Sequence, residues 1–274
     1  MSMRHTIRNI LLTAGYVHPA TIAVAFRRGP GAAKKYLAEI YRCSKTDAGS
    51  YLPRVTLDEI APVATEFVVS RPPDWSGSMT ITEISSLCHL VAARCPRKVL
   101  EIGSFRGLTT LNIALNAKDS EIHTLDLSPD TDPENTKFKT NDVNIIVSRG
   151  SYYYEGRPEA TRIQQHYGDT ATFDYSEIGP GVDFCLIDAA HSYEYIGNDT
   201  AKSLALMTDD GLILWHDYGR NDFLAEPEDA WGVTRFLHEI ADVGVGILQG
   251  TSLGVLALTR DKREELARHL GISL

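Results

Sequence analysis

Residues 99–110 read VLEIGSFRGLTT, and the fold can be worked out from this stretch. Its first four positions are mostly apolar, as in a buried strand, and Gly103 ends the run. Gly107 follows shortly after, and the next segment, TTLNIALNA (109–117), has helical spacing. Glycine lets a backbone turn sharply and approach a ligand closely. The stretch therefore predicts a strand that turns through a glycine loop into a helix.

The same alternation of strands and helices continues along the chain. We expect strands at 98–103, 121–127, 143–150, 183–188 and 211–217, and helices at 81–95, 109–117, around 159–167 and at 194–207. Continuous apolar strands between helices indicate a parallel sheet covered on both faces. Two apolar segments, 243–250 and 253–260, predict a reversed pair at the sheet edge. The expected fold is α/β: a Rossmann-like, doubly wound, mostly parallel sheet with a reversed final strand.

The first 79 residues are expected to add a helical segment and a linker. Apolar side chains recur at helical spacing in 5–16, 19–26 and 32–42, and residues 68–80 are rich in proline and polar residues. Thr80 and Glu83 then form the pattern of a capping box, which begins a helix. We predict two domains, residues 1–79 and 80–274.

Composition is that of a soluble globular protein. The chain has 274 residues, of which 43% are hydrophobic and 23% charged. Its four cysteines include no C-x-x-C pair, which favours a reducing compartment, the cytoplasm. No apolar run approaches the roughly 18–20 residues of a membrane span.

Charge is distributed unevenly along the chain. Residues 1–45 hold eight lysines and arginines against one acid, a net charge of +7, and the remainder carries −16. The basic arm either packs against its own acidic body or a second subunit of a homo-oligomer, or makes peripheral contact with an anionic membrane or substrate. The acidic body argues against nucleic acid as a partner.

Chemically active side chains follow four of the predicted strands. In open parallel sheets, ligands bind outside the carboxyl ends of the strands. These ends carry Glu101 with the glycine loop, Asp126, Asp188 with His191, and His216 with Asp217. The loop spacing is G-x-x-x-G and not the G-x-G-x-x-G of dinucleotide sites, which counts against NAD. A carboxylate such as Asp126 can accept both hydroxyls of a ribose.

Five segments together resemble the motifs of a class I S-adenosylmethionine-dependent methyltransferase. They are VLEIGSFRGLTT (99–110), IHTLDLS (122–128), YGDTATFDY (167–175), VDFCLIDAAHSYEYIGND (182–199) and GLILWHDYG (211–219). The resemblance covers roughly residues 80–260. Within this class, the motifs most resemble the small-molecule O-methyltransferases, a branch that includes sugar methyltransferases. It implies that the cofactor is bound by Glu101, Gly103, Ser104 and Gly107 at its methionine part, Asp126 at its ribose, Asp169 and Thr170 at its adenine, and also by Asp188.

The resemblance also implies a divalent metal, Mg²⁺ in many relatives, on Asp188, His216 and Asp217. An imidazole at His216 departs from the all-carboxylate pair, because Mg²⁺ prefers oxygen ligands. Three alternatives stay open: His216 only hydrogen-bonds, the ion is softer than Mg²⁺, or the site is metal-free.

His191 is the candidate general base. Methyl transfer to a hydroxyl requires that the hydroxyl lose a proton, and an imidazole with a pKa near neutrality suits that role. The alternative is that His191 only caps the following helix. The resulting hypothesis is an enzyme that methylates a hydroxyl of a small molecule, a sugar or a glycosylated natural product, with S-adenosylmethionine.

Two rival hypotheses belong to other classes. One is an NAD(P)-dependent enzyme on a similar sheet, which the loop spacing and the reversed strand pair disfavour. The other is a non-catalytic, methyltransferase-like binding subunit, which the retention of Glu101, Asp126, Asp188 and His191 disfavours. The N-terminal helices would cover the acceptor or join subunits.

Overall fold

The computed structural model describes residues 52–61, 66–70, 78–132, 135–138, 151–219 and 232–274. All of them belong to one compact unit, Leu52–Leu274. The helices expected before residue 43 and the strand expected at 143–150 lie outside the described residues.

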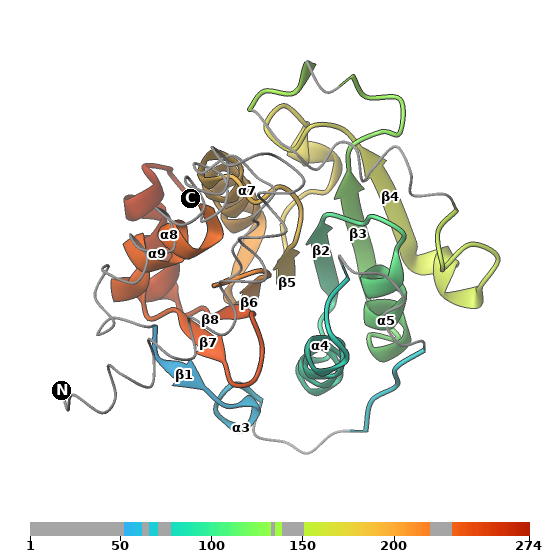
Figure 1. Ribbon diagram of the computed structural model, residues 1–274, viewed down its shortest axis with the longest axis horizontal. Helices are drawn as coiled ribbons and strands as arrows, with labels where there is room; N and C mark the ends of the chain where they lie inside the picture. The colour runs from blue at the N-terminus through green and yellow to red at the C-terminus, as the bar shows by residue number, and fades with distance from the viewer. Residues whose placement is uncertain (1–51, 62–65, 71–77, 133–134, 139–150, 220–231) are drawn as a thin grey trace, which may run out of the picture. The chain divides into compact units, whose positions relative to one another are not determined.

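One eight-stranded sheet organises the unit (Figure 1). Its strands are β1 (Arg54–Val55), β2 (Lys98–Ile102), β3 (Glu121–Asp126), β4 (Ile163–Tyr167), β5 (Val182–Ile187), β6 (Met207–Trp215), β7 (Gly246–Leu248) and β8 (Gly254–Ala257). Their order across the sheet is β1-β7-β8-β6-β5-β2-β3-β4. Every pairing is parallel except those of β8, which runs antiparallel to both β6 and β7.

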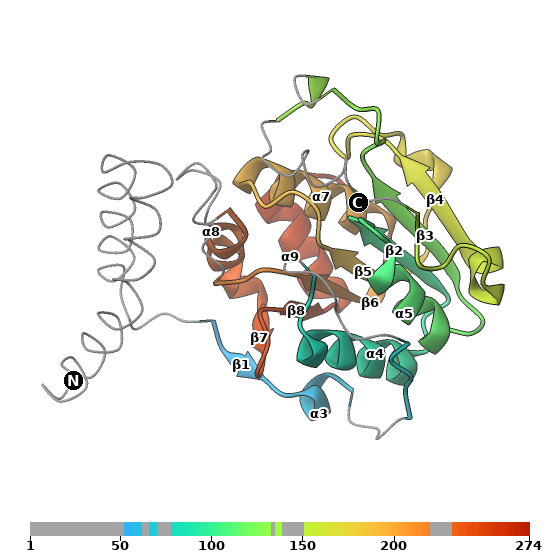
Figure 2. The ribbon, with the colours of Figure 1, turned by 45° about the vertical axis from the view of Figure 1, so that its right-hand side comes forward.

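Helices cover both faces of this sheet (Figure 2). The helices are α3 (Leu57–Ile60), α4 (Ile81–Arg94), α5 (Leu108–Asn116), α7 (Tyr193–Leu206), α8 (Gly232–Glu239) and α9 (Arg260–Leu270). Successive strand side chains point to opposite faces. Phe184 and Leu186 join the core beneath α4 and α5, whereas Cys185 and Ile187 join the core beneath α7, α8 and α9. The fold is therefore the predicted Rossmann-like, doubly wound α/β sheet with one reversed strand.

The reversed strand β8 is not at the edge, because it lies between β6 and β7. The edge is β1, which pairs with β7 through Arg54 and Val55. The compact unit thus begins before the domain division that we predicted at residues 79 and 80.

The helix predicted around 159–167 is wrong in its second half. Pro158–Arg162 form a short 3-10 helix, and Ile163–Tyr167 are strand β4, paired to β3. The polar sequence IQQHY suits a sheet edge that has only one strand neighbour.

Helix α4 begins as predicted. The Thr80 side chain accepts from the backbone N–H of Glu83, whose carboxylate accepts from the Thr80 N–H. Thr56 and Glu59 form the same capping box at α3. Among the described residues, no helix has the length and apolar character to cross a membrane.

Candidate functional site

Gly103 joins the ends of β2 and β5. Its φ is +99°, and a Cβ there would lie 2.0 Å from the carbonyl oxygen of Asp188. The Asp188 N–H in turn donates to the carbonyl of Ile102, at 2.8 Å. Only glycine permits this close approach. The glycine loop and the Asp188 segment are therefore fixed against each other.

Gly107 is the N-cap residue of α5 and has a φ of +69°. A Cβ at Gly107 would lie 2.5 Å from the ring of Tyr154. The Tyr154 hydroxyl donates to Gln165 at 2.7 Å, and the Gln165 amide donates to the hydroxyl of Ser104 at 3.2 Å. A tyrosine and the edge strand β4 thus hold the loop.

Glu101 lies beneath the loop and is fully buried. One of its oxygens accepts hydrogen bonds from the hydroxyls of Thr110 and Thr124, the latter at 2.6 Å, and the other has no hydrogen-bond partner. Burial raises the pKa of Glu101 to about 7, although the two hydroxyl donors lower it. The structure therefore places Glu101 under the loop and not on its surface.

Asp126 lies at the end of β3 and ties that strand to the loop. Its two carboxylate oxygens accept from the backbone N–H groups of Phe105, at 2.7 Å, and Leu127, at 2.8 Å. Phe105 has a φ of +44°, so this turn is strained for a residue other than glycine. A carboxylate at this position is of the type that can accept the hydroxyls of a ribose.

Asp169 follows β4, and its carboxylate accepts hydrogen bonds from three groups of the described residues. The donors are the N–H of Lys137 at 2.6 Å, the N–H of Ala171 at 2.9 Å and the hydroxyl of Tyr195 at 3.1 Å. Thr170 is buried beside Asp199, a carboxyl whose pKa burial raises to about 7. The predicted adenine residues are thus part of a packed, internally bonded loop.

Asp188, His191 and Asp217 gather where β5 and β6 end. His191 Nε2 lies 2.8 Å from Asp217 Oδ2. Each of the three residues offers one ligand atom, and these atoms all lie within 4.8 Å of one another. The side chain of His191 is 33% exposed, whereas that of Asp217 is 6% exposed, so the imidazole is the accessible member.

His216 stands behind this group, and both of its ring nitrogens face carboxylates. Nδ1 lies 2.9 Å from Asp188 Oδ1 and 3.4 Å from Asp217 Oδ1, and Nε2 lies 3.5 Å from Glu83 Oε2. In the described residues, the group that can hold a metal contains His191 in the place that we predicted for His216.

The carboxylates decide the charge of His216. Burial lowers its pKa, but the charge and hydrogen bond of Asp188, with Glu83 and Asp217, raise it well above the usual value. Burial likewise raises the pKa of Glu83, and the His216 and Ser252 hydrogen bonds lower it further than burial raises it. His216 is thus a buried imidazole among three carboxylates, which favour its protonated form.

The structure brings most of the predicted site residues to one end of the sheet, where the parallel strands have their carboxyl ends. Gly103 contacts Asp188, Asp126 binds the loop, and His191 faces Asp217. Sequence reasoning found Glu83 only as a capping residue. Its contact with His216 joins two distant segments, and no local pattern indicates that contact.

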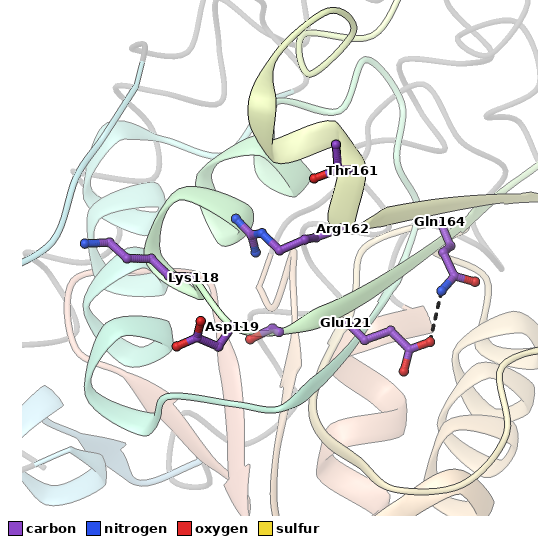
Figure 3. A pocket seen from close by; sticks show the side chains of 7 residues that line it. Lys118, Asp119, Glu121, Thr161, Arg162 and Gln164 are labelled. Atoms are coloured by element: carbon purple, nitrogen blue, oxygen red, sulfur yellow. Dashed lines mark hydrogen bonds between the residues drawn. The ribbon is translucent and has the colours of Figure 1, made fainter.

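A hollow lies away from this group, at the end of the sheet where β3 and β4 begin (Figure 3). Its volume is about 400 Å³, and it is lined by Lys118, Asp119, Ser120, Glu121, Thr161, Arg162 and Gln164. Gln164 donates to Glu121 across it at 2.9 Å (Figure 3). None of the predicted site residues lines this hollow.

Comparison with protein families gives one match. Residues 100–218 match a family model described as a methyltransferase domain. This range contains every predicted site residue. A comparison with curated proteins finds no match.

Three solved structures are similar to the chain at low identity. Cofactor-bound Rv0187 from MTB is 20% identical over 87% of this chain and 94% of its own, with a TM-score of 0.44. S-adenosylhomocysteine-bound methyltransferase PaMTH1 of Podospora anserina is 17% identical over 69% and 83%, with a TM-score of 0.47. O-methyltransferase TomG of Streptomyces achromogenes, in complex with S-adenosylmethionine, is 17% identical over 81% and 96%, with a TM-score of 0.48.

Proposed function

Because residues 100–218 match the model of a methyltransferase domain, we propose that this protein transfers a methyl group from S-adenosylmethionine to a hydroxyl of a small molecule. One observation carries the proposal most strongly. A partly exposed imidazole, His191, lies 2.8 Å from the buried Asp217 carboxylate, and Asp188 of the same group contacts Gly103 of the glycine loop. This pair is suited to remove a proton at the edge where the cofactor is expected.

The cofactor would lie along the carboxyl ends of β2, β3 and β4. The loop from Gly103 to Gly107, with Ser104 between them, would border the methionine part. Asp126 would accept the ribose hydroxyls, and Asp169 and Thr170 would flank the adenine. Buried Glu101 would act on the methionine part from beneath, through the loop.

The reaction is an in-line displacement at the methyl carbon. The acceptor oxygen forms a bond to that carbon while the bond from carbon to sulfur breaks, and its electron pair stays on sulfur. The positively charged sulfonium becomes the neutral thioether S-adenosylhomocysteine. In the proposed step the His191 imidazole accepts the hydroxyl proton, and the Asp217 carboxylate, whose Oδ2 lies 2.8 Å from Nε2, stabilises the resulting imidazolium.

A divalent cation is a second element of the proposal, and the residues fit it. Asp188, His191 and Asp217 would hold the ion, since their ligand atoms lie within 4.8 Å of one another. Two carboxylates and one imidazole suit Mn²⁺ or Fe²⁺ better than Mg²⁺. When bound, the ion would act as a Lewis acid that lowers the pKa of the acceptor hydroxyl.

The two roles of His191 can be separated by experiment. If His191 is a base, His191→Asn lowers kcat by about 10²–10⁴-fold and leaves cation affinity nearly unchanged. If His191 is a metal ligand, the same substitution also weakens Mn²⁺ binding, which calorimetry on the full chain measures without turnover. Chelation with EDTA is the matching test on the wild-type protein.

The acceptor class rests on the sequence motifs that resemble sugar O-methyltransferases. We propose a sugar or a glycosylated natural product as the acceptor. A panel of hydroxylated acceptors, assayed for S-adenosylhomocysteine release, identifies the class.

Cofactor binding tests the proposal as a whole. We expect S-adenosylhomocysteine to bind wild-type protein in calorimetry, and Asp126→Ala to weaken that binding. No binding at millimolar ligand would overturn the proposal, and a nicotinamide fluorescence titration then tests the NAD(P) alternative. Binding without turnover on any acceptor would favour a non-catalytic binding subunit.

A further inference from the structure

Glu83 does more than cap helix α4. One of its oxygens, Oε2, accepts from the Thr80 N–H at 2.7 Å and lies 3.5 Å from His216 Nε2. The other, Oε1, accepts from the N–H and hydroxyl of Ser252, at 2.8 and 2.7 Å. The carboxylate is buried and fully used, so its position is fixed by the start of α4 and the turn before β8.

The chain contains a second capping box that serves as a comparison. Glu59 accepts from the Thr56 N–H at 2.6 Å and from its hydroxyl at 2.9 Å, as Glu83 does from Thr80 at 2.7 and 2.8 Å. Glu59 is exposed, whereas Glu83 is buried. Capping alone therefore does not require the burial or the extra partners of Glu83.

His216 transmits the position of Glu83 to the site. Nε2 of His216 faces Glu83, and Nδ1 faces Asp188 and Asp217. The ring therefore lies between the Glu83 carboxylate and the two carboxylates of the site. Both ring nitrogens need a proton to donate in these directions. A buried ring held at both ends has one orientation, and it fixes the Asp188 oxygen that lies 2.9 Å away.

We propose that Glu83 is a positioning residue for the reaction, acting through His216 to orient the Asp188 carboxylate at the site. The inference rests on the proposed function, because it assigns Asp188 a place in the reacting group. Glu83 contacts neither acceptor nor cofactor in this scheme, so its removal should slow the chemical step more than it weakens binding.

The test compares Glu83→Gln with Glu59→Gln in the full chain. Glutamine can keep its oxygen at the Thr80 cap, but it removes the carboxylate charge beside His216, and its NH2 group cannot accept the hydrogen bonds from Ser252. For Glu83→Gln we expect kcat to fall about 10–100-fold, as is typical when the support of a site residue is lost. The affinity for S-adenosylhomocysteine should change less than about threefold. Glu59→Gln should leave both quantities unchanged.

A double-mutant cycle separates a positioning role from a structural one. If Glu83 acts through His216, Glu83→Gln has no further effect on kcat in a His216→Asn background. If its effect is the same in both backgrounds, the proposal is wrong. A parallel loss of kcat and cofactor affinity in Glu83→Gln would also overturn it, because that pattern indicates general disruption.

A spectroscopic measurement keeps the inference testable if a variant is unstable or the protein proves inactive. In the wild-type protein, proton NMR with ¹⁵N-labelled histidine should show both ring N–H protons of His216, protected from exchange. Ser252→Ala removes a hydroxyl donor to Glu83 but keeps the carboxylate, and should retain the Nε2 proton signal. Absence of that signal in the wild-type protein contradicts the geometry. Absence of turnover with the signal intact means instead that the proposed function has failed.

Discussion

At the level of single residues, the site depends on backbone positions that few side chains allow. Gly103 has a φ of +99° and faces the Asp188 carbonyl, and Asp217 has a φ of +69° beside His191. Non-glycine residues in this region cost about 1–3 kcal/mol and cluster at functional sites. The strained backbone at Asp217 therefore coincides with its place in the proposed catalytic pair with His191.

Gly103→Ala should destabilise the protein severely. The new Cβ would lie 2.0 Å from a backbone oxygen, which cannot move without breaking the contact between β2 and β5. We expect a loss of about 2–4 kcal/mol in the free energy of unfolding, measured in urea. Gly250→Ala is the control: its φ is +81° but nothing lies within 4 Å, so about 1 kcal/mol is expected. Equal losses would refute the steric explanation.

Glu101 should make stability depend on pH. Its pKa is 4.5 in the reference state and about 7 in the fold, so between these values the folded state keeps a proton that the unfolded chain loses. The free energy of unfolding should therefore fall by about 3 kcal/mol as pH rises from 4.5 to 7, and then level off. Glu101→Gln should flatten this fall, leaving the slope from Asp199, whose pKa is also raised. Parallel pH profiles for the two proteins would contradict the assignment.

At the level of elements, residues 66–70 form a segment, here called the strap, that is hydrogen-bonded to α5. The Asn116 amide pairs with both the N–H and the carbonyl of Val68, each at 2.8 Å, and Asn112 accepts from the Ser70 N–H at 2.9 Å. Two asparagines on one helix thus replace the hydrogen bonds that a neighbouring strand would supply.

Asn116→Ala should release one point of this strap. Hydrogen exchange at the Val68 amide should speed up by about tenfold, and stability should fall by about 1 kcal/mol, since the bonds are exposed. The Ser70 amide, which Asn112 holds, is the internal control and should keep its exchange rate. Equal acceleration at both amides would show that the strap detaches as a whole.

The sequence predicts some elements far better than others, for physical reasons. Strands β2, β3, β5 and β6 are largely buried, and the apolar runs of β2, β5 and the second half of β6 are visible locally. Edge strand β4 is polar and was mistaken for a helix, and β1 has only two residues, too few for a pattern. The strand ends correctly predicted Asp188, His191 and Asp217 as neighbours. The part played by Glu83 depends on a contact between distant segments and could not be predicted.

At the level of the whole molecule, two hydrophobic cores lie on the two faces of one sheet. The predicted cofactor residues come from β2, β3, β4 and β5 and the loops after them. A ligand that spans these loops would add contacts between elements that the sheet and a few hydrogen bonds already join.

S-adenosylhomocysteine should therefore raise the thermal stability of the whole unit. At a ligand concentration one hundred times Kd, linkage adds about 2.7 kcal/mol to the free energy of unfolding, measured by calorimetric melting. Asp126→Ala should lose most of this gain at the same ligand concentration. A gain of equal size in the variant would mean that the ligand binds elsewhere.

The position of β8 between β6 and β7 has a consequence for biosynthesis. The first strand of the sheet, β1, touches only β7, and β7 reaches the rest of the sheet only through β8. On the ribosome, β1 has no strand partner until β7 has emerged, and these two strands join the rest of the sheet only when β8 has emerged at residue 257. The earliest strand to be made is thus the last to be secured, and a nascent chain stalled before that point would leave the β6 edge open to other chains.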